Sequence, residues 1–476
     1  MKTEPVPNVE SKYSWREVSR AESPKRSASE RIADFFEVYS FLDEETAREQ
    51  ASRCIQCPEP TCVEGCPLNN QIPEWLALTS EGRFLDAARL LQTSSCMEEI
   101  FARVCSRPCE SNCILDGHAD PVAINAIERF LHDYGFAHGA MEVAPPPPTG
   151  LKVAIVDSGP CGLTCAYDLA RRGYGVTVFD AQAEPGGLLV KGIPAFKLQK
   201  NLVQRRITLL QQLGVVFRMG VKSGRDISLQ DLRAQHDAVF FGACAGQARP
   251  LEIPGADLHG VYQGLAFIIQ KNLDNPAETA PIDVKGMRVV VLGGGDVAMD
   301  CLRTARRCEP RDVLCVYRRD EASLPAHRHE FAEALEEGAR FEFLATPIAL
   351  AGNPAGHVAH VRCLRTQLGE PDASGRPQPQ PIPGSEFDLP ADVVLVAFGF
   401  DSLPFCAEGD LSQIAVSPDG RIGVDENLMT NVPGVFAGGA LVRGAGLFLD
   451  SVRDARKAAA AIQHYLAAQG ARKTVS

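Results

Sequence analysis

The feature that most constrains this chain is a dense group of cysteines in its first quarter. Seven of the 16 cysteines fall into two closely spaced runs. The runs are Cys54-x2-Cys57-x4-Cys62-x3-Cys66-Pro67 and Cys105-x3-Cys109-x3-Cys113. Close spacing lets one loop present several thiolates to a small inorganic core, as an iron–sulfur cluster requires. In two-cluster ferredoxins the cysteine before the proline binds the other cluster, so this pattern favours two clusters.

Zinc is the alternative for the same cysteines, because a tetrahedral zinc site also accepts Cys-x2-Cys. A disulfide framework is less consistent with the sequence, since the first 20 residues carry charges where a secretory signal has its apolar core. Cys96 fits the spacing of neither run, and we interpret it as a buried thiol. The eight cysteines from Cys161 onward are scattered, and we expect them to be small core residues.

Acidic side chains outnumber basic ones, with 60 Asp and Glu against 48 Lys and Arg, which leaves a net charge of −12. Nucleic acids and anionic membrane surfaces both attract a basic face, so this charge argues against either as a partner. No apolar run approaches the ~18 residues of a membrane-spanning helix. We therefore expect a cytoplasmic protein with no membrane span and no nucleic-acid partner.

Changes in composition divide the first third of the chain. Residues 1–45 are polar, and we expect a loose arm that turns into a helix before the first cysteine. Residues 46–144 contain IPEWLALTSEGRFLDAARLL and VAINAIERFLHDYG, in which apolar residues recur near helical spacing. This range predicts a small helical domain held together by metal. The prolines within 145–150 predict a stiff, extended linker.

Beyond the linker, two stretches each predict a strand, a glycine-rich turn, a helix and a second strand. The first is LKVAIVDSGPCGLTCAYDLARRGYGVTVFDA, and the second is KGMRVVVLGGGDVAMDCLRTARR followed by VLCVYRRD. ADVVLVAFGF predicts another buried strand, and GVFAGGALVRG precedes a C-terminal helix. The fold class is therefore α/β, with two Rossmann-like nucleotide-binding domains behind the helical domain.

The turn of the second stretch predicts a dinucleotide site. It contains Gly293, Gly294, Gly295 and Asp296. Glycines let the backbone approach a pyrophosphate, and the N-terminus of the next helix faces its charge. Arg318 and Arg319 follow the next strand, where an NAD site has an acidic residue. Two guanidinium groups suit a 2′-phosphate, which favours NADPH; the alternative is a solvated basic pair.

The turn of the first stretch is less regular. Gly159 and Gly162 are retained, but Asp157 stands where the first glycine belongs. Asp180 ends the next strand and suits a ribose diol. The pair that follows, Gly186 and Gly187, suits backbone contact with a flavin nucleotide.

Together these motifs resemble the family of the small (β) subunit of NADPH-dependent glutamate synthase. Related proteins include the N-terminal part of dihydropyrimidine dehydrogenase and the large subunit of NADH-dependent ferredoxin–NADP oxidoreductase. The resemblance runs from about Arg31 to about Leu466. It rests on CIQCPEPTCVEGCP, IPEWLALTSEGRFLDAA, EPGGLLVKGIPAFKL, VVVLGGGDVAMDC, VYRRD and GVFAGG, in that order.

The resemblance implies two 4Fe-4S clusters, and then an FAD-binding domain at 151–280 and 390–476 that is interrupted by an NADPH-binding domain at 281–389. One cluster would be held by Cys54, Cys57, Cys62 and Cys113. The other would be held by Cys66, Cys105, Cys109 and Glu128. From the sequence alone, Glu128 would be interpreted as an exposed helix carboxylate. Gly439 occupies the family's glycine position near the flavin.

The family's chemistry is hydride transfer from NADPH to FAD, followed by single-electron steps through the clusters to a partner protein. The flavin is needed because nicotinamide gives two electrons together, whereas clusters accept one each. The sequence contains no recognisable amidotransferase or 2-oxoglutarate site, and it assigns no catalytic residue. We therefore expect an electron-transfer subunit whose partner is a glutamate synthase large subunit or another electron acceptor.

The departures from the family pattern lie around the flavin. Asp157 replaces a glycine, Cys244 ends the turn Gly242-Ala243-Cys244, and Ala440 replaces the family's aspartate. These changes motivate an alternative function, that of a non-catalytic iron–sulfur subunit that lacks flavin and relays electrons within a larger complex or caps it. A zinc-stapled NADPH-binding regulator is a third possibility.

Overall fold

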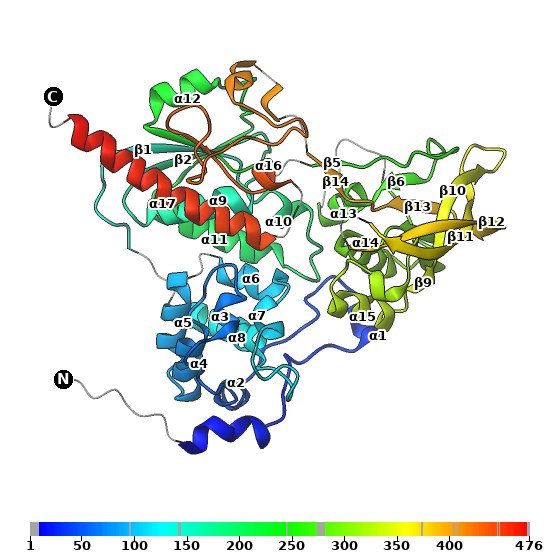
Figure 1. Cartoon of the computed structure of the whole chain (residues 1–476), viewed down its shortest axis with the longest axis horizontal. Helices are drawn as coiled ribbons and strands as arrows, with labels where there is room; N and C mark the ends of the chain where they lie inside the picture. The colour runs from blue at the N-terminus through cyan, green and yellow to red at the C-terminus, as the bar shows by residue number, and fades with distance from the viewer. Residues whose placement is uncertain are drawn as a thin grey trace.

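The computed structural model describes residues 9–94, 97–140, 144–243, 246–273, 281–372, 375–402, 405–407, 409–444, 446 and 448–473. Cys96 and Cys244 lie outside these residues. A helical domain comes first in the chain and is followed by two nucleotide-binding units, each built on a parallel sheet (Figure 1). None of the described helices is both long and apolar enough to cross a membrane.

The helical domain packs around one tryptophan. Its helices are α2 (Glu44–Ser52), α3 (Thr61–Glu64), α4 (Ile72–Ser80), α5 (Phe84–Ser94), α6 (Glu98–Val104), α7 (Pro108–Ser111) and α8 (Ile124–Ala137). Trp75 of α4 is fully buried, and its indole N–H donates to Asn70 Oδ1 at 3.2 Å. Ile127 and Leu131 of α8 are buried in the same core. The amphipathic segments identified in the sequence thus form α4, α5 and α8.

The first unit is a five-stranded parallel sheet in the order β15-β4-β1-β2-β3. Its strands are β1 (Lys152–Val156), β2 (Gly175–Asp180), β3 (Val216–Met219), β4 (Ala238–Phe241) and β15 (Val435–Ala437). Its helices are α9 (Pro160–Ala170), α10 (Leu188–Lys191), α11 (Lys200–Gln212), α12 (Leu229–Gln235), α16 (Ala440–Arg443) and α17 (Phe448–Lys473). Two short 3-10 turns, η3 (Phe405–Ala407) and η4 (Gly409–Gln413), lie beside α12.

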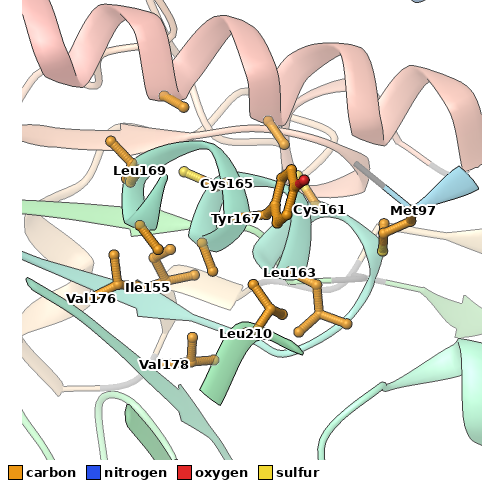
Figure 2. Close-up of a cluster of buried hydrophobic side chains, with 14 of the residues drawn as sticks. Met97, Ile155, Cys161, Leu163, Cys165, Tyr167, Leu169, Val176, Val178 and Leu210 are labelled. Atoms are coloured by element: carbon orange, nitrogen blue, oxygen red, sulfur yellow. The ribbon is translucent and has the colours of Figure 1, made fainter. Parts of the chain in front are cut away.

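A parallel sheet needs apolar cover on both faces, and α9 covers one face of the first sheet. Figure 2 shows Leu163 and Leu169 of α9 together with Ile155 of β1 and Val178 of β2. Cys161 and Cys165 lie in the same core, beneath the long helix α17. The buried cysteines outside the two runs are Cys161, Cys165, Cys301, Cys315, Cys363 and Cys406. They are core residues, as the sequence predicts, and Cys308 is half-buried.

The second unit is a five-stranded parallel sheet in the order β6-β13-β7-β8-β9. Its strands are β6 (Val261–Gln263), β7 (Arg288–Leu292), β8 (Asp312–Tyr317), β9 (Arg340–Phe343) and β13 (Val393–Val396). Its helices are α13 (Gly264–Asn272), α14 (Asp296–Arg306), the 3-10 turn η2 (Glu321–Ser323) and α15 (Arg328–Glu336). A three-stranded antiparallel sheet adjoins it, formed by β10 (Ala345–Gly352), β11 (Val358–Pro371) and β12 (Pro377–Pro390).

The second unit extends beyond the range 281–389 that the resemblance implies. β6 and α13 precede this range, and β13 follows it. β13 pairs in parallel with both β6 and β7, so it cannot belong to the first sheet. The run ADVVLVAFGF predicts a buried strand without specifying its sheet, which is why this boundary was wrong. The chain crosses between the units at β5 (Gln247–Ala248) and β14 (Phe400–Asp401), which pair antiparallel.

The polar N-terminal segment is not a loose arm over its described residues. After η1 (Val9–Arg16), residues 17–43, which we call the strap, run from the helical domain to α15 of the second unit (Figure 1). Val38 N–H donates to Phe196 O at 3.2 Å, and Arg31 at the end of α1 (Ala28–Arg31) pairs with Glu337. The helix expected in this part of the chain forms only over α2, because residues 33–43 adopt a turn, bends and an isolated bridge between Tyr39 and Lys25.

The helical domain is joined to the first unit through a buried ion cluster. Arg206 of α11 is fully buried, and its Nη2 lies 2.7 Å from Glu98 Oε2 and 2.5 Å from Glu99 Oε2 of α6. Separating the partners of such a cluster leaves unpaired buried charges. The cluster therefore fixes how the helical domain meets the first unit. The linker contains no helix or strand in residues 144–150, and its Thr149 N–H donates to Gly173 O at 2.8 Å.

Candidate cofactor sites

Four cysteines of the helical domain surround one cavity. Cys54, Cys57, Cys62 and Cys113 line it, with about 360 Å³ of unfilled space that is partly open to solvent. Apolar side chains such as Ile72 and Leu76 form the other walls. Burial, with repulsion from neighbouring thiolates, raises the pKa of Cys54 and Cys62 to about 12. Thiolates gathered around one cavity need a positive core to balance their charge, which an iron–sulfur cluster supplies.

The second set of predicted ligands also converges. Burial and the charge of Glu128 raise the pKa of Cys105 to about 12, and burial, with a smaller contribution from the same carboxylate, raises the pKa of Cys66 and Cys109. Glu128 lies on α8 and is only 9% exposed, so its interpretation as an exposed helix carboxylate is wrong. Burial, with repulsion from Glu98 and Glu110, raises its own pKa to about 8. Nothing in the sequence pattern alone indicates that Glu128 faces the cysteines.

Zinc, the alternative for these cysteines, has its own geometric requirement. A zinc site places four ligand atoms about 2.0–2.3 Å from one ion. Among the residues that the structure describes, no three His, Cys, Asp or Glu side chains gather closely enough to hold a single metal ion. A cluster core is larger and keeps its thiolates farther apart. The described residues therefore offer no ready-made site for a single zinc ion.

The glycines predicted for FAD meet at one edge of the first sheet. Gly159 caps α9, and a Cβ on Gly187 would lie 3.0 Å from Gly159 Cα. A Cβ on Gly162 would lie only 1.9 Å from Asp157 O, so the helix must pass close to the turn here. Gly186 N–H donates to Ser158 O at 3.1 Å. A Cβ on Gly439 would lie 3.1 Å from Cys161 Sγ of α9. These close approaches form a backbone cradle of the kind a flavin nucleotide occupies.

Two aspartates border this cradle. Asp180 Oδ2 accepts hydrogen bonds from Ser158 N–H at 2.8 Å and Ser158 Oγ at 2.5 Å. Asp157 has a φ of 91°, in the region that favours glycine, and its Oδ2 accepts the Gly159 N–H at 2.7 Å. Burial and the neighbouring Asp180 raise the pKa of Asp157 to about 7. Asp157 therefore occupies the first-glycine position in conformation as well as in sequence.

Asp454 and Arg443 support the cradle from behind, and the sequence analysis missed both. Asp454 of α17 is 1% exposed, and its Oδ2 accepts the Gly439 N–H at 3.1 Å. Arg443 binds both carboxylate oxygens of Asp454, at 2.6 Å each. An aspartate within the alanine-rich α17 is a signal that could have identified the pair. Ala440, which follows Gly439 and begins α16, has no polar side chain to offer a flavin.

The predicted dinucleotide turn of the second unit is open. Gly293 has a φ of 134°, and a Cβ there would lie 2.3 Å from Ala397 O. Gly295 caps α14, and a Cβ there would meet no atom within 4 Å. Gly294 packs against Tyr317, since a Cβ there would lie 2.6 Å from the ring. The space over Gly295 and the helix N-terminus together provide the place for a pyrophosphate.

Asp296 of this turn pairs with His327. Its Oδ1 accepts the His327 N–H at 3.0 Å, and its Oδ2 lies 2.8 Å from His327 Nδ1. The hydrogen bond that His327 donates to Asp296 raises the pKa of His327. Burial opposes the charge on Asp296, but the hydrogen bonds from His327 outweigh it and lower the pKa of Asp296. Asp296 thereby ties the start of α14 to the start of α15.

Arg318 and Arg319 do not act as a pair. Arg319 is 3% exposed, and it holds the turn between β11 and β12 through Asp372 at 3.0 Å and Pro377 O at 2.6 Å. Arg318 is exposed at the end of β8 and forms no ion pair among the residues described. Only Arg318 is therefore available to a ligand, whereas the sequence analysis assigned both guanidinium groups to a 2′-phosphate.

Comparison with known families covers almost the whole chain. Residues 31–140 match the family described as dihydropyrimidine dehydrogenase domain II, 4Fe-4S cluster. Residues 151–464 match the pyridine nucleotide-disulphide oxidoreductase family. Among solved structures, Mycobacterium tuberculosis FprA in complex with NADPH aligns with a TM-score of 0.57 at 22% identity, covering 68% of this chain and 86% of that one. This likeness shows the fold of the two units.

Individual relatives extend the match. The small chain of NADPH glutamate synthase from Escherichia coli K12 is 40% identical over 468 residues, covering 95% of this chain and 98% of the relative. The protein of the same name from Azospirillum brasilense is 40% identical, covering 94% of each chain. The putative oxidoreductase AegA of Escherichia coli K12 is 41% identical, covering 94% of this chain and 70% of the relative.

These matches confirm several predictions from the sequence. They support the oxidoreductase class and the three kinds of cofactor, which are 4Fe-4S clusters, FAD and NADP(H). They do not favour the alternative of a subunit without flavin. A family model matches most of the chain, and the chain covers two of its relatives nearly from end to end. The chain therefore belongs to the family of small chains of NADPH-dependent glutamate synthase.

Proposed function

We propose that this chain oxidises NADPH in the second unit and passes the electrons through FAD in the first unit and two 4Fe-4S clusters to a partner protein. The observation that carries the proposal is the convergence of two four-residue ligand sets in a domain that packs directly against the first unit. FAD supplies the conversion of one hydride into two single electrons.

The proposed nucleotide contacts follow from the geometry of the two turns. In the second unit, Gly295 and the N-terminus of α14 bind the pyrophosphate of NADPH, and Arg318 binds its 2′-phosphate. In the first unit, the backbone of Gly159, Gly186, Gly187 and Gly439 cradles the FAD. Asp180 lies at the end of β2, where it can accept hydrogen bonds from the ribose.

The proposed order of the clusters follows from their packing. Cys105, of the set with Cys66, Cys109 and Glu128, packs against the core of the first unit. Cys54, Cys62 and Cys113 pack on the core of the helical domain, as do Cys66 and Cys109, so among these cysteines Cys105 is the one that reaches the first unit. Ile114, next to Cys113, is 49% exposed. The set with Cys105 therefore receives electrons from the flavin, and the set with Cys113 delivers them at the surface.

We propose a glutamate synthase large subunit as the partner. The relatives named as small chains are covered over 94–98% of their length, whereas AegA continues well beyond the matched region. The proposed sites include none for glutamine or 2-oxoglutarate, so a partner would use the electrons. The dependence of both clusters on reduced thiolates supports a cytoplasmic location.

The cofactor content and electron transfer of the purified chain test this proposal. Anaerobic protein should contain about eight iron atoms and a similar amount of sulfide for two 4Fe-4S clusters, together with one FAD per chain. NADPH should then reduce a one-electron dye, and glutamate should form when the large subunit and its substrates are added. Iron without flavin would instead support the relay subunit, and reduction of the dye without glutamate formation would point to a different partner.

A further inference from the structure

The glycine-rich turns of the two units follow the same course but differ in what lies over the helix N-terminus. Gly159 caps α9 at φ −74° and ψ −171°, and Gly295 caps α14 at φ −89° and ψ −179°. A Cβ on Gly295 would meet no atom within 4 Å, whereas a Cβ on Gly159 would lie 2.7 Å from Asp157 Oδ2. The space that is open in the second unit is therefore filled by a carboxylate in the first.

The carboxylate of Asp157 accepts a hydrogen bond from an amide that a bound dinucleotide also needs. In Rossmann-like sites the amides of this turn and the helix N-terminus face the pyrophosphate. Asp157 Oδ2 accepts the Gly159 N–H at 2.7 Å, so a pyrophosphate and Asp157 compete for the same donor. Asp157 also holds a φ of 91°, where the corresponding residue of the second unit is Gly293 at 134°. A side chain held in this region is uncommon and is often retained at a functional site.

The surroundings of Asp157 are negative on one side and uncharged on the others. The charged group that acts on it is Asp180 at the end of β2, which is itself held by Ser158. Ser158 and Gly159 of the turn, and Gly186 of the facing loop, carry no charge. Burial and Asp180 raise the pKa of Asp157 to about 7, so both of its forms are populated near neutral pH. A bound pyrophosphate brings further negative charge to this turn and favours the protonated form.

We propose that FAD binding by this chain displaces Asp157 from the Gly159 amide and takes up one proton from solvent onto its carboxylate, so that FAD affinity falls as pH rises. The inference rests on the proposed function only in that the first unit binds FAD. An ionised carboxylate about 5 Å from a phosphate charge weakens binding on the order of a hundredfold at an effective dielectric near 20. The pyrophosphate of FAD stays fully ionised throughout the neutral range, so the titrating group belongs to the protein.

FAD titrations of the anaerobic, cluster-containing chain test this coupling. Protein stripped of FAD is titrated at about pH 6 and about pH 8.5, on either side of the Asp157 transition. The wild-type Kd should rise by up to about 30-fold between the two, which is the limit for uptake of one proton by a group with a pKa of about 7. Asp157→Asn and Asp157→Gly should bind at the higher pH as tightly as wild type binds at the lower. Glu184→Gln, which removes an exposed carboxylate from the neighbouring loop, should keep the wild-type pH slope.

The outcomes separate this inference from the proposed function. FAD that binds with the same Kd at both pH values overturns the coupling and leaves the proposed function intact. If the Kd of Asp157→Asn for FAD still rises with pH, another group takes up the proton, and the proposed coupling is also overturned. If neither wild type nor Asp157→Gly binds FAD at either pH, the flavin step of the proposed function fails as well. Iron content equal to wild type verifies that each variant is folded.

Discussion

Arg31 of the strap and Glu337 at the end of α15 form a buried ion pair, with 3.2 Å between Nη1 and Oε1 across 306 positions of sequence. The same carboxylate binds Arg303 of α14 at 3.0 Å and Arg307 at 2.5 Å. Glu337 is 2% exposed, so these charges interact with little screening by water. One carboxylate therefore joins the strap to two turns of α14.

Replacing Glu337 should destabilise the second unit. Glu337→Ala leaves Arg307 without its carboxylate and removes one partner each from Arg31 and Arg303. We expect a loss of about 3–5 kcal/mol in the free energy of unfolding, as for other buried pairs broken on one side. Urea denaturation followed by circular dichroism measures this loss.

The neighbouring Glu336 provides a matched control. It binds Lys25 and Arg31 of the same strap, each at 2.7 Å, but its side chain is 41% exposed. Glu336→Ala should therefore cost about 1 kcal/mol or less. Equal losses for the two variants would show that burial does not give Glu337 its larger role.

The grouping of cluster ligands predicts how iron is lost from cysteine variants. Cys54→Ala and Cys113→Ala remove ligands of one proposed cluster, so each single variant and the double variant should lose about four iron atoms. Cys113→Ala combined with Cys109→Ala should lose nearly all of the iron, because it affects both clusters. Iron assay and paramagnetic resonance of the reduced proteins measure these losses.

Cys363→Ala is the control for the iron assay, because Cys363 is a buried thiol in the antiparallel sheet, far from both ligand sets in the fold. It should keep the full iron content. If the Cys54 and Cys113 double variant lost twice as much iron as either single variant, the two cysteines would bind different clusters.

The two adjacent arginines of the second unit should respond differently to substitution. Arg318→Ala removes an exposed guanidinium from the proposed 2′-phosphate site, and we expect KM for NADPH to rise about 10–100-fold with KM for NADH unchanged. Arg319→Ala loosens the turn between β11 and β12 and should lower stability by about 1–3 kcal/mol. Steady-state kinetics with both nucleotides separate the two effects; a selective loss of NADPH in Arg319→Ala alone would reverse the assignment.

The open space over Gly295 predicts a variant that folds but binds NADPH poorly. Gly295→Ala adds a methyl group where no protein atom lies within 4 Å, at a φ of −89° that alanine accepts. Stability should be unchanged within about 0.5 kcal/mol, while the Kd for NADPH rises because the methyl group meets the pyrophosphate. Gly293→Ala, in which the Cβ would lie 2.3 Å from Ala397 O, should instead lose stability. Thermal unfolding and NADPH titration of both variants test this contrast.

The Asp296 and His327 pair predicts a pH effect at the start of α15. Because the pairing raises the pKa of folded His327 above 6.5, its stabilising effect is complete below that pH and is lost as pH rises through the folded pKa. The lowered pKa of Asp296 sets the acid limit, since its contribution is lost only as pH falls below 3.8. In a histidine NMR titration, Asp296→Asn should lower the pKa of His327, and Asp320→Asn should leave it unchanged.

Local motifs were enough to predict the parts of this chain that depend on nearby residues. The turns at Gly159 and Gly295 lie between strand and helix as predicted, because the required backbone conformation is encoded within a few positions. The first cysteine run predicted neighbours for the same reason, since Cys54 and Cys57 lie on one loop and Cys62 lies on the short helix α3 that follows it. Glu128 was predicted as a cluster ligand only through the resemblance to a family.

Features that depend on distant contacts could not be predicted from local pattern. The strap is polar and resembles a free arm, yet its position is fixed by Glu333, Glu336 and Glu337 in the second unit. Arg318 and Arg319 are equivalent in sequence, and only the hairpin carrying Asp372 distinguishes them. β13 was assigned to the wrong unit because a buried strand has the same composition in either sheet.

The strap and the paired crossings of β5 and β14 reach the second unit at opposite sides (Figure 1). Two adjacent crossings alone act as a hinge and leave a unit free to swing about one axis. A third tether placed away from that axis blocks the swing. We therefore expect the two units to keep one relative orientation, so that catalytic turnover would not require the reorientation of domains that a two-point attachment would permit.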